Sequence, residues 1–504
     1  MRKTFFLLLF LFSFLSTHAA PEKRLVLPMT YGDAMVIQRK RPITFHGRAP
    51  QGENVTVLLK GNGRVLRRTA QAGASGGWNV VLPALPASGP YTLKISCGND
   101  ERTFSDVWVG EVWLCSGQSN MELPLSSIAT AKADLAVADT LSRLHLMNMP
   151  SPWLTYKQVW STAMIDSLDR GLIRQTGAWA RCSAETAQSF SAIGFHFGRV
   201  LTDSLGIHVG LINNAVGGST TEGWIDSLTL AKGAPEILEG DWRKNNNIME
   251  WARTRADYNL QKADPSRPHR HPYAPTFLYN AALKPLESYP VRGVLWYQGE
   301  SNAELPEEHA KLFPLLEQSW RRTFGNGLLP FFTVQLSGIS TRPSWPAFRD
   351  SQRRLAKQLH HTWMAVSSDL GDSLDVHPRR KAPVGERLAR QVLYNIYGYK
   401  QLVPEGPAPL TATAADDGTV ALHFNFGASL HGAEGRPIEG FELCGKDGKW
   451  HKATVTSSAD GSLTLQSPAV SDPKQVRYAW QPLPHANLVN ADELPCSTFL
   501  MDVE

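Results

Sequence analysis

Short apolar runs alternate with amphipathic stretches between about residues 106 and 400. The apolar runs are β-prone and end in small or polar residues: 107–115, 209–216, 291–295 and 363–367. In the stretch 384–397, by contrast, apolar residues recur on one face with the period of about 3.6 residues expected of a helix. This alternation predicts an α/β domain over 106–400, with a central parallel sheet flanked by helices.

The two flanks of this region have a different pattern. Residues 21–105 and 410–504 contain short strand-like runs separated by turns rich in Gly and Pro. Such punctuation predicts a β-sandwich-like module at the N-terminal side and a second β-rich module at the C-terminal side. Within the α/β region, the polar segment 225–271 is interpreted as an insertion, and insertions at the rim of a sheet often wall a binding cleft.

Residues 1–20 have the features of a cleavable signal peptide. Two basic residues precede an apolar run over 4–15, and small residues follow it. The run is too short to span a bilayer. Because no cysteine stands at the expected cleavage site, we expect no lipid anchor. The predicted location is therefore periplasmic or secreted, without a membrane anchor.

Charge and cysteine content exclude several classes of protein. The chain has 504 residues and a formal net charge of +5, with scattered basic residues, so we expect no nucleic-acid partner. Five scattered cysteines are too few for a disulfide scaffold. No CxxC, HExxH or histidine-rich spacing is present, so we expect no metal and no cofactor. The sequence leaves the oligomeric state open.

Chemically useful side chains follow the four apolar runs. The carboxyl ends of parallel strands meet at one edge of a sheet, where catalytic groups collect. In chain order, the runs lead to Ser119, to Gly217 and Gly218, to Gln298, and to Asp375 with His377. A hydroxyl, a Gly-Gly turn, an amide and a carboxylate–imidazole pair are the parts of a serine esterase.

The motifs around these residues resemble a known family. They are Gly117-Gln118-Ser119-Asn120-Met121, Gly217-Gly218, Trp296-Tyr297-Gln298-Gly299-Glu300-Ser301-Asn302, and Asp375-Val376-His377-Pro378 with Lys381 beyond. Together they are similar to the sialate O-acetylesterase family of the SGNH hydrolase superfamily. The resemblance extends over nearly all of the chain after the signal peptide. It implies an SGNH-hydrolase-like α/β fold with β-rich modules at both ends, and O-acetylated sialic acids as the substrate.

Ser119 is the predicted nucleophile and His377 the predicted base. A neutral hydroxyl attacks an ester slowly unless a base takes its proton. Asp375 is the predicted partner that orients His377. In the superfamily the acid stands three residues before the histidine, where this chain has a leucine. Asp372 and Asp369 therefore remain rivals on the same loop.

The oxyanion of the reaction needs hydrogen-bond donors. We expect the backbone N–H groups of Ser119 and Gly218 to be two of these donors. Gly218 suits this role because a residue without Cβ lets the backbone approach an ester closely. Gly217 is the alternative to Gly218. The third predicted donor is the side chain of Gln298, which we favour over Asn302 because it directly follows the strand.

These assignments predict a secreted serine carbohydrate esterase that works through an acetyl-enzyme. The alternatives are an acetylesterase for acetylxylan or another polysaccharide, and a non-catalytic carbohydrate-binding protein. The intact Ser119 and His377 argue against the last. Glu300 is expected to bond backbone N–H groups and fix its loop. Arg349 and Arg379 can either meet a sugar carboxylate or form ordinary surface pairs.

Overall fold

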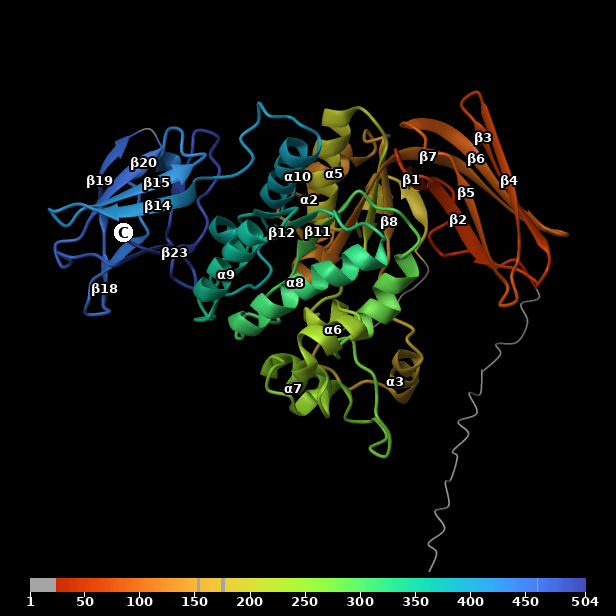
Figure 1. Ribbon diagram of the computed structural model, residues 1–504, viewed down its shortest axis with the longest axis horizontal. Coiled ribbons are helices and arrows are strands. Elements are labelled where there is room, and N and C mark those ends of the chain that lie inside the picture. Colours follow the sequence, from red (N-terminus) through yellow and green to blue (C-terminus); the bar gives the residue numbers. More distant parts are fainter. Residues whose placement is uncertain (1–23, 152–154, 174–176, 460) are drawn as a thin grey trace, which may run out of the picture.

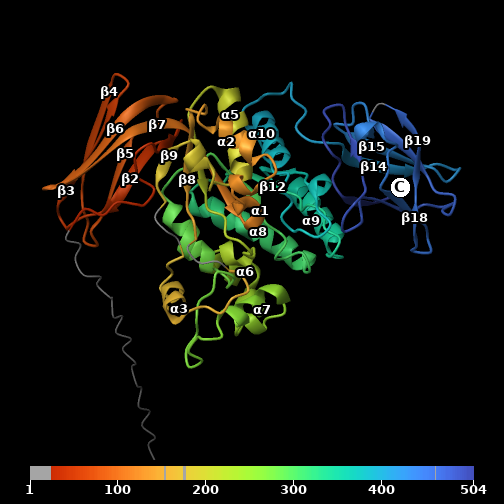
Figure 2. The same cartoon turned by 180° about the vertical axis from the view of Figure 1, so that it is seen from behind.

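The computed structural model describes residues 24–151, 155–173, 177–459 and 461–504, arranged as three parts in a row (Figure 1). The α/β domain is in the middle, and Figure 2 shows from behind that the two β-rich parts lie at its opposite ends. The predicted signal peptide falls within residues 1–23 and so lies outside the described residues. No helix in the described ranges is long and apolar enough to cross a membrane.

The central sheet contains seven strands. Their spatial order is β13 (Thr362–Ala365), β12 (Phe331–Val334), β11 (Gly293–Tyr297), β7 (Asp100–Gly117), β10 (Val209–Asn213), β8 (Leu144–Asn148) and β9 (Trp179–Arg181). The pairs from β13 to β8 are parallel, and only the edge strand β9 runs antiparallel to its neighbour. The predicted α/β fold is confirmed, with a mixed rather than purely parallel sheet.

Successive side chains of β7 pack alternately into two hydrophobic cores, one on each face of the sheet. Trp113 points to the face covered by α5 (Ala192–Leu205) and α10 (Ala382–Ile396), where its ring meets Phe197 at a centroid distance of 5.3 Å. Val112 belongs to the other core, on the side of α8 (Pro306–Thr323). Side chains on a strand point to opposite faces in turn, so a run that is apolar at every position must be covered on both sides.

The remaining helices complete the domain. They are α1 (Ser119–Glu122), α2 (Ala131–Ala138), α3 (Thr162–Asp169), α4 (Ala184–Ala187), α6 (Ser227–Gly233), α7 (Glu250–Asn259) and α9 (Trp345–Gln358). Helices α3, α6 and α7 form a lobe that projects from the sheet on one side (Figures 1 and 2). Two of these helices, α6 and α7, come from the segment predicted as an insertion, 225–271.

The N-terminal module is joined to the α/β domain through one long strand. It contains β1 (Val36–Gln38), β2 (Ile43–Arg48), β3 (Asn54–Gly61), β4 (Arg64–Gln71), β5 (Gly77–Leu82) and β6 (Ser88–Cys97). The first half of β7 pairs with β6, and its second half pairs with β10 and β11. Because β7 runs through position 105, no linker separates the two parts there.

The C-terminal module holds two four-stranded antiparallel sheets. One contains β14 (Ala408–Ala414), β15 (Val420–Asn425), β20 (Ser462–Gln466) and β19 (Thr454–Ala459), and the other contains β18 (Trp450–Lys452), β17 (Phe441–Cys444), β21 (Gln475–Tyr478) and β23 (Phe499–Asp502). A short pair, β16 (His431–Gly432) and β22 (Leu488–Val489), lies beside them. Arg349 of α9 is 0 % exposed and donates to the carbonyl groups of Ala479, Gln481 and Pro482. Arg349 therefore fastens this module to the α/β domain and is not available to a ligand.

Candidate active site

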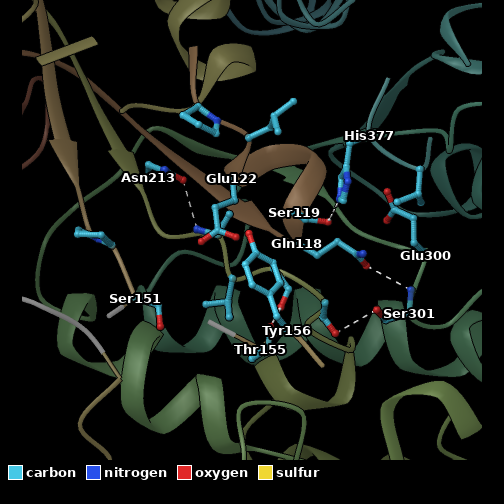
Figure 3. A pocket seen from close by; sticks show the side chains of 18 of the residues that line it. Gln118, Ser119, Glu122, Ser151, Thr155, Tyr156, Asn213, Glu300, Ser301 and His377 are labelled. Atoms are coloured by element: carbon cyan, nitrogen blue, oxygen red, sulfur yellow. Dashed lines mark hydrogen bonds between the residues drawn. The ribbon is translucent and has the colours of Figure 1, made fainter. Parts of the chain in front are cut away.

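The strand ends of the α/β domain surround one large cavity of about 860 Å³. Ser119 follows β7, Gly217 and Gly218 follow β10, Glu300 follows β11, and His377 stands in the loop between β13 and α10. All five residues line the cavity, and Figure 3 shows Ser119, Glu300 and His377 among its side chains. The structure thus brings together side chains and turns that are more than 250 residues apart in the chain, as the parallel sheet predicts.

Ser119 and His377 are in direct contact. Oγ of Ser119 and Nε2 of His377 are joined by a hydrogen bond of 2.8 Å. Burial lowers the pKa of His377, although the Asp375 carboxylate opposes this effect. The imidazole is therefore neutral at pH 7 and can accept the serine proton.

The turn that presents Ser119 requires a glycine two residues before the serine. Gly117 has φ +124°, and a Cβ there would lie 2.1 Å from the carbonyl oxygen of Tyr297 on β11. Only glycine fits this backbone conformation and this approach. The chain then enters α1, whose first residue is Ser119. The strand-to-helix turn therefore exposes the hydroxyl at the sheet edge, as a nucleophile requires.

Asp375 is the nearest to His377 of the three rival carboxylates. Its Oδ1 lies 3.7 Å from Nδ1 of His377 and accepts the backbone N–H of His377 over 2.8 Å. Asp372 instead accepts the backbone N–H groups of Leu374 and Asp375. Asp369 forms a two-pronged ion pair with Arg387, with both distances 2.7 Å. Asp372 and Asp369 are thus occupied elsewhere, while Asp375 acts on His377 at a distance longer than a hydrogen bond.

Two backbone N–H groups beside the nucleophile are free. Within the described ranges, the N–H groups of Ser119 and Gly218 donate to no acceptor. Gly218 has φ +69°, and a Cβ there would lie 2.0 Å from the hydroxyl of Tyr273. A Cβ at Gly217 would lie 3.7 Å from Cβ of Ser119, so this turn passes close to the nucleophile. The arrangement suits an oxyanion hole built from backbone.

Gln298, the predicted third donor, has its side-chain amide engaged away from the cavity. Its Nε2 donates to the carbonyl of Ser219 over 3.2 Å and to Oδ1 of Asn302 over 2.6 Å, so both amide hydrogens are engaged. The side chain is 1 % exposed and does not line the cavity. Asn302, its alternative, donates to Glu222 and does not line the cavity either. Both side-chain amides form hydrogen bonds that join the loop after β11 to the loop after β10.

Gln118 and Asn120, the two neighbours of Ser119 in the sequence, were given no role in the sequence analysis. Their side chains hold the loops of the site together. Oε1 of Gln118 accepts the backbone N–H groups of Gly299 and Ser301, each over 3.3 Å. The side-chain N–H groups of Asn120 donate to Glu300 and to the carbonyl of Val376, beside His377. The signal that could have found these roles is a pair of amides directly after a buried strand, where burial demands partners.

Asn120 also accepts a hydrogen bond from the ammonium group of Lys381, which is 1 % exposed. Burial lowers the pKa of Lys381 to about 7, opposed by the negative charge of Glu300. Burial likewise raises the pKa of Glu300, opposed by its bond to Asn120. Glu300 was expected to bond backbone N–H groups; in the structure it accepts from the Asn120 side chain and from its own backbone N–H.

The predicted insertion walls one side of the cavity. Met249, Trp251 and Arg255 line it from that segment. In Figure 3, Thr155 and Tyr156 lie on the side of Ser119 away from His377. Nη1 of Arg255 donates to the carbonyl of Thr155 over 2.7 Å, which joins the insertion to this part of the wall.

Comparison with known proteins agrees with this geometry. A family model described as "Carbohydrate esterase, sialic acid-specific acetylesterase" matches residues 109–394. The sialate O-acetylesterase of Rattus norvegicus is 28% identical over 90% of this chain and 89% of its own length. That of Homo sapiens is also 28% identical, over 89% of this chain and 86% of its own length.

A solved structure extends the agreement to the whole fold. A carbohydrate acetylesterase from Xanthomonas citri superposes with a TM-score of 0.78 and 31% identity, covering 95% of this chain and 99% of the other. The sequence resemblance is therefore confirmed. The chain belongs to the sialic acid-specific acetylesterase family of carbohydrate esterases.

Proposed function

We propose that this carbohydrate esterase removes O-acetyl groups from sialic acids through an acetyl-enzyme on Ser119. The observation that carries the mechanism is the 2.8 Å contact between Ser119 and His377 beside two free backbone N–H groups. An activated hydroxyl next to oxyanion donors is the arrangement that acyl transfer needs.

The first half of the reaction acylates the enzyme. Oγ of Ser119 attacks the acetyl carbonyl carbon while its proton moves to Nε2 of His377. The carbonyl oxygen becomes an oxyanion and accepts hydrogen bonds from the N–H groups of Ser119 and Gly218. When the tetrahedral intermediate collapses, the bond to the sugar oxygen breaks and His377 returns the proton to that oxygen.

The second half releases acetate. His377, neutral again, takes a proton from a water molecule that attacks the acetyl-Ser119 carbonyl. The resulting intermediate collapses to acetate, and the proton returns from His377 to Oγ of Ser119. Asp375 supports the imidazolium that forms in both halves, from 3.7 Å.

Sialic acid is favoured as the sugar by the family's description and by the names of the rat and human relatives. The main alternative is acetylxylan or another acetylated polysaccharide. A non-catalytic carbohydrate-binding role is disfavoured by the assembled Ser119–His377 pair. We also propose that the protein is exported to the periplasm or secreted, because the N-terminal sequence has the form of a signal peptide.

Acetate release from O-acetylated sialoglycans and from acetylated xylan tests the proposal. We expect release from the sialoglycan by the parent protein and none by Ser119→Ala. Release from xylan alone would overturn the choice of sugar. Trapping of a radiolabelled acetyl group on the parent, released by hydroxylamine and absent from Ser119→Ala, tests the acetyl-enzyme.

A further inference from the structure

Among the residues that the structure describes, one arginine of the cavity forms no ion pair with a protein carboxylate. Two arginines line it, Arg255 and Arg342. Nη1 of Arg342 lies 3.6 Å from the carboxylate of Glu304. In the part of the chain that the structure describes, Arg255 forms no ion pair, and its single hydrogen bond goes to the carbonyl of Thr155. Most of its five N–H donors are therefore available to a ligand.

Packing holds Arg255 in place. Its guanidinium lies over the ring of Trp251, 5.1 Å from the centroid, and Trp251 stacks in turn on Tyr273 at 5.5 Å. A guanidinium fixed by a ring and by one hydrogen bond loses little further freedom when it binds a ligand. The side chain is half-buried, which reduces screening by solvent.

Arg255 is connected to the reaction centre by a short chain of contacts. It binds the carbonyl of Thr155, and the hydroxyl of Thr155 donates to the carbonyl of Gly217 over 2.9 Å. Gly217 is adjacent to Ser119. The guanidinium is therefore linked to the oxyanion turn through two hydrogen bonds and lines the same cavity as Ser119.

The two acidic groups of the cavity lie on different sides of Ser119. Oε2 of Glu122 would lie 2.9 Å from a Cβ placed on Gly217, on the same side as Thr155, whereas Glu300 stands beyond Ser119 with His377 (Figure 3). Glu300 repels a second negative charge on its side of the cavity. With the ester of an anionic sugar at Ser119, the position that offers its carboxylate a cation is the one at Arg255.

We propose that Arg255 binds the carboxylate of an acidic O-acetylated sugar and makes the esterase prefer acidic over neutral acetylated sugars. This rests on the proposed function and names a residue that sets its specificity. A planar guanidinium matches a carboxylate through two parallel N–H···O bonds, a geometry that a lysine cannot reproduce.

A matched pair of substrates isolates the charge. One is O-acetylated N-acetylneuraminic acid, and the other is the same sugar with its carboxylate converted to a carboxamide. We expect the parent to show a kcat/KM for acetate release at least about tenfold higher on the acid, and this ratio to fall as salt is added. Arg255→Gln should bring the ratio close to one, mainly by raising KM on the acid, while Arg255→Lys should keep an intermediate ratio.

Arg342→Gln is the control, because it removes a cavity arginine that already has a carboxylate partner. It should keep the parent's ratio. A ratio near one in the parent, or an undiminished ratio in Arg255→Gln, would overturn the inference while leaving the esterase intact. A parent that releases acetate from none of these sugars would overturn the proposed function and the inference with it.

A second acidic substrate shows which kind of acidic sugar supplies the carboxylate that Arg255 binds. Acetylated galacturonic acid oligosaccharides carry the same charge on a different ring. If Arg255 recognises the carboxylate, Arg255→Gln should lower kcat/KM on whichever acidic sugar the parent hydrolyses. Faster hydrolysis of the galacturonate by the parent would keep Arg255 as the anchor and overturn sialic acid as the substrate.

Discussion

Oδ1 of Asp375 accepts the backbone N–H of His377 over 2.8 Å, and the same atom lies 3.7 Å from Nδ1 of the imidazole. The carboxylate therefore shapes the loop directly and acts on the imidazole mainly through its charge. Its side chain is 44 % exposed, so solvent weakens that effect. This differs from a buried triad aspartate, whose loss costs about 10⁴ in kcat.

Asp375→Asn is accordingly expected to lower kcat by about ten- to a hundredfold, well short of the loss at a buried triad. The carboxylate raises the pKa of His377, so its removal should lower that pKa and shift the acid limb of the kcat/KM profile to lower pH. The pH profile of the variant checks this. Asp369→Asn, which breaks only the Arg387 pair, is the matched control and should leave the limb in place. A loss of 10⁴ would contradict the account.

The variant Gln298→Ala distinguishes two roles for this side chain, joining two loops or donating a hydrogen bond to the oxyanion. Loss of such a donor costs on the order of a hundredfold or more in kcat. Because both amide hydrogens of Gln298 are engaged with Ser219 and Asn302, we expect kcat to fall by less than about tenfold and stability by about 1–3 kcal/mol. Turnover and urea unfolding of the variant test this. A hundredfold loss of kcat at unchanged stability would restore the original prediction.

Gly218→Ala is expected to be far more harmful than the size of a methyl group suggests. The residue has φ +69°, and the added Cβ would lie 2.0 Å from the hydroxyl of Tyr273. The oxyanion turn must then move, so kcat should fall by about a hundredfold or more. Steady-state kinetics check this. Tyr273→Phe is not expected to rescue the variant, because Cζ of residue 273 and Cη2 of Trp251 would still lie 2.7 and 2.8 Å from the added Cβ. Near-parental activity of Gly218→Ala would contradict the assignment.

Lys381→Met should destabilise the protein by about 1–3 kcal/mol, because it leaves Oδ1 of Asn120 without its buried donor and removes the positive charge that acts on Glu300. Adding Glu300→Gln removes the unbalanced charge and should restore part of the loss. Urea unfolding of the two single variants and the double variant measures this coupling. Strictly additive losses would show that the two charges do not interact.

Acid should destabilise the fold partly through His309. Burial lowers its pKa to about 3, and it packs between Phe313 and Phe348. Since the folded-state pKa lies below the unfolded value of about 6.5, its contribution is complete above that pH and falls as pH drops towards 3, by about 1 kcal/mol per unit. His309→Phe should flatten urea-unfolding stability between pH 6.5 and 4. If the stability of His309→Phe depended on pH as steeply as that of the parent, the result would contradict this prediction.

The sequence predicted the parts of the site that depend on local geometry. Ser119 and His377 follow buried strands, and parallel strands end together, so their meeting did not require knowledge of side-chain packing. The hydrogen bonds of Gln298 depend on Ser219, 79 positions away, whose orientation no local pattern reveals. The same holds for Arg349, whose partners lie in the C-terminal module. The boundary expected at 105 was placed by a change of composition, which cannot show that β7 continues through it.

The most direct measurement is acetate release from an O-acetylated sialoglycan by the purified parent and by Ser119→Ala. The account predicts steady release by the parent and a rate at least about 10³-fold lower for the variant. Equal rates from the two proteins would show that Ser119 is not the nucleophile and would contradict the central claim.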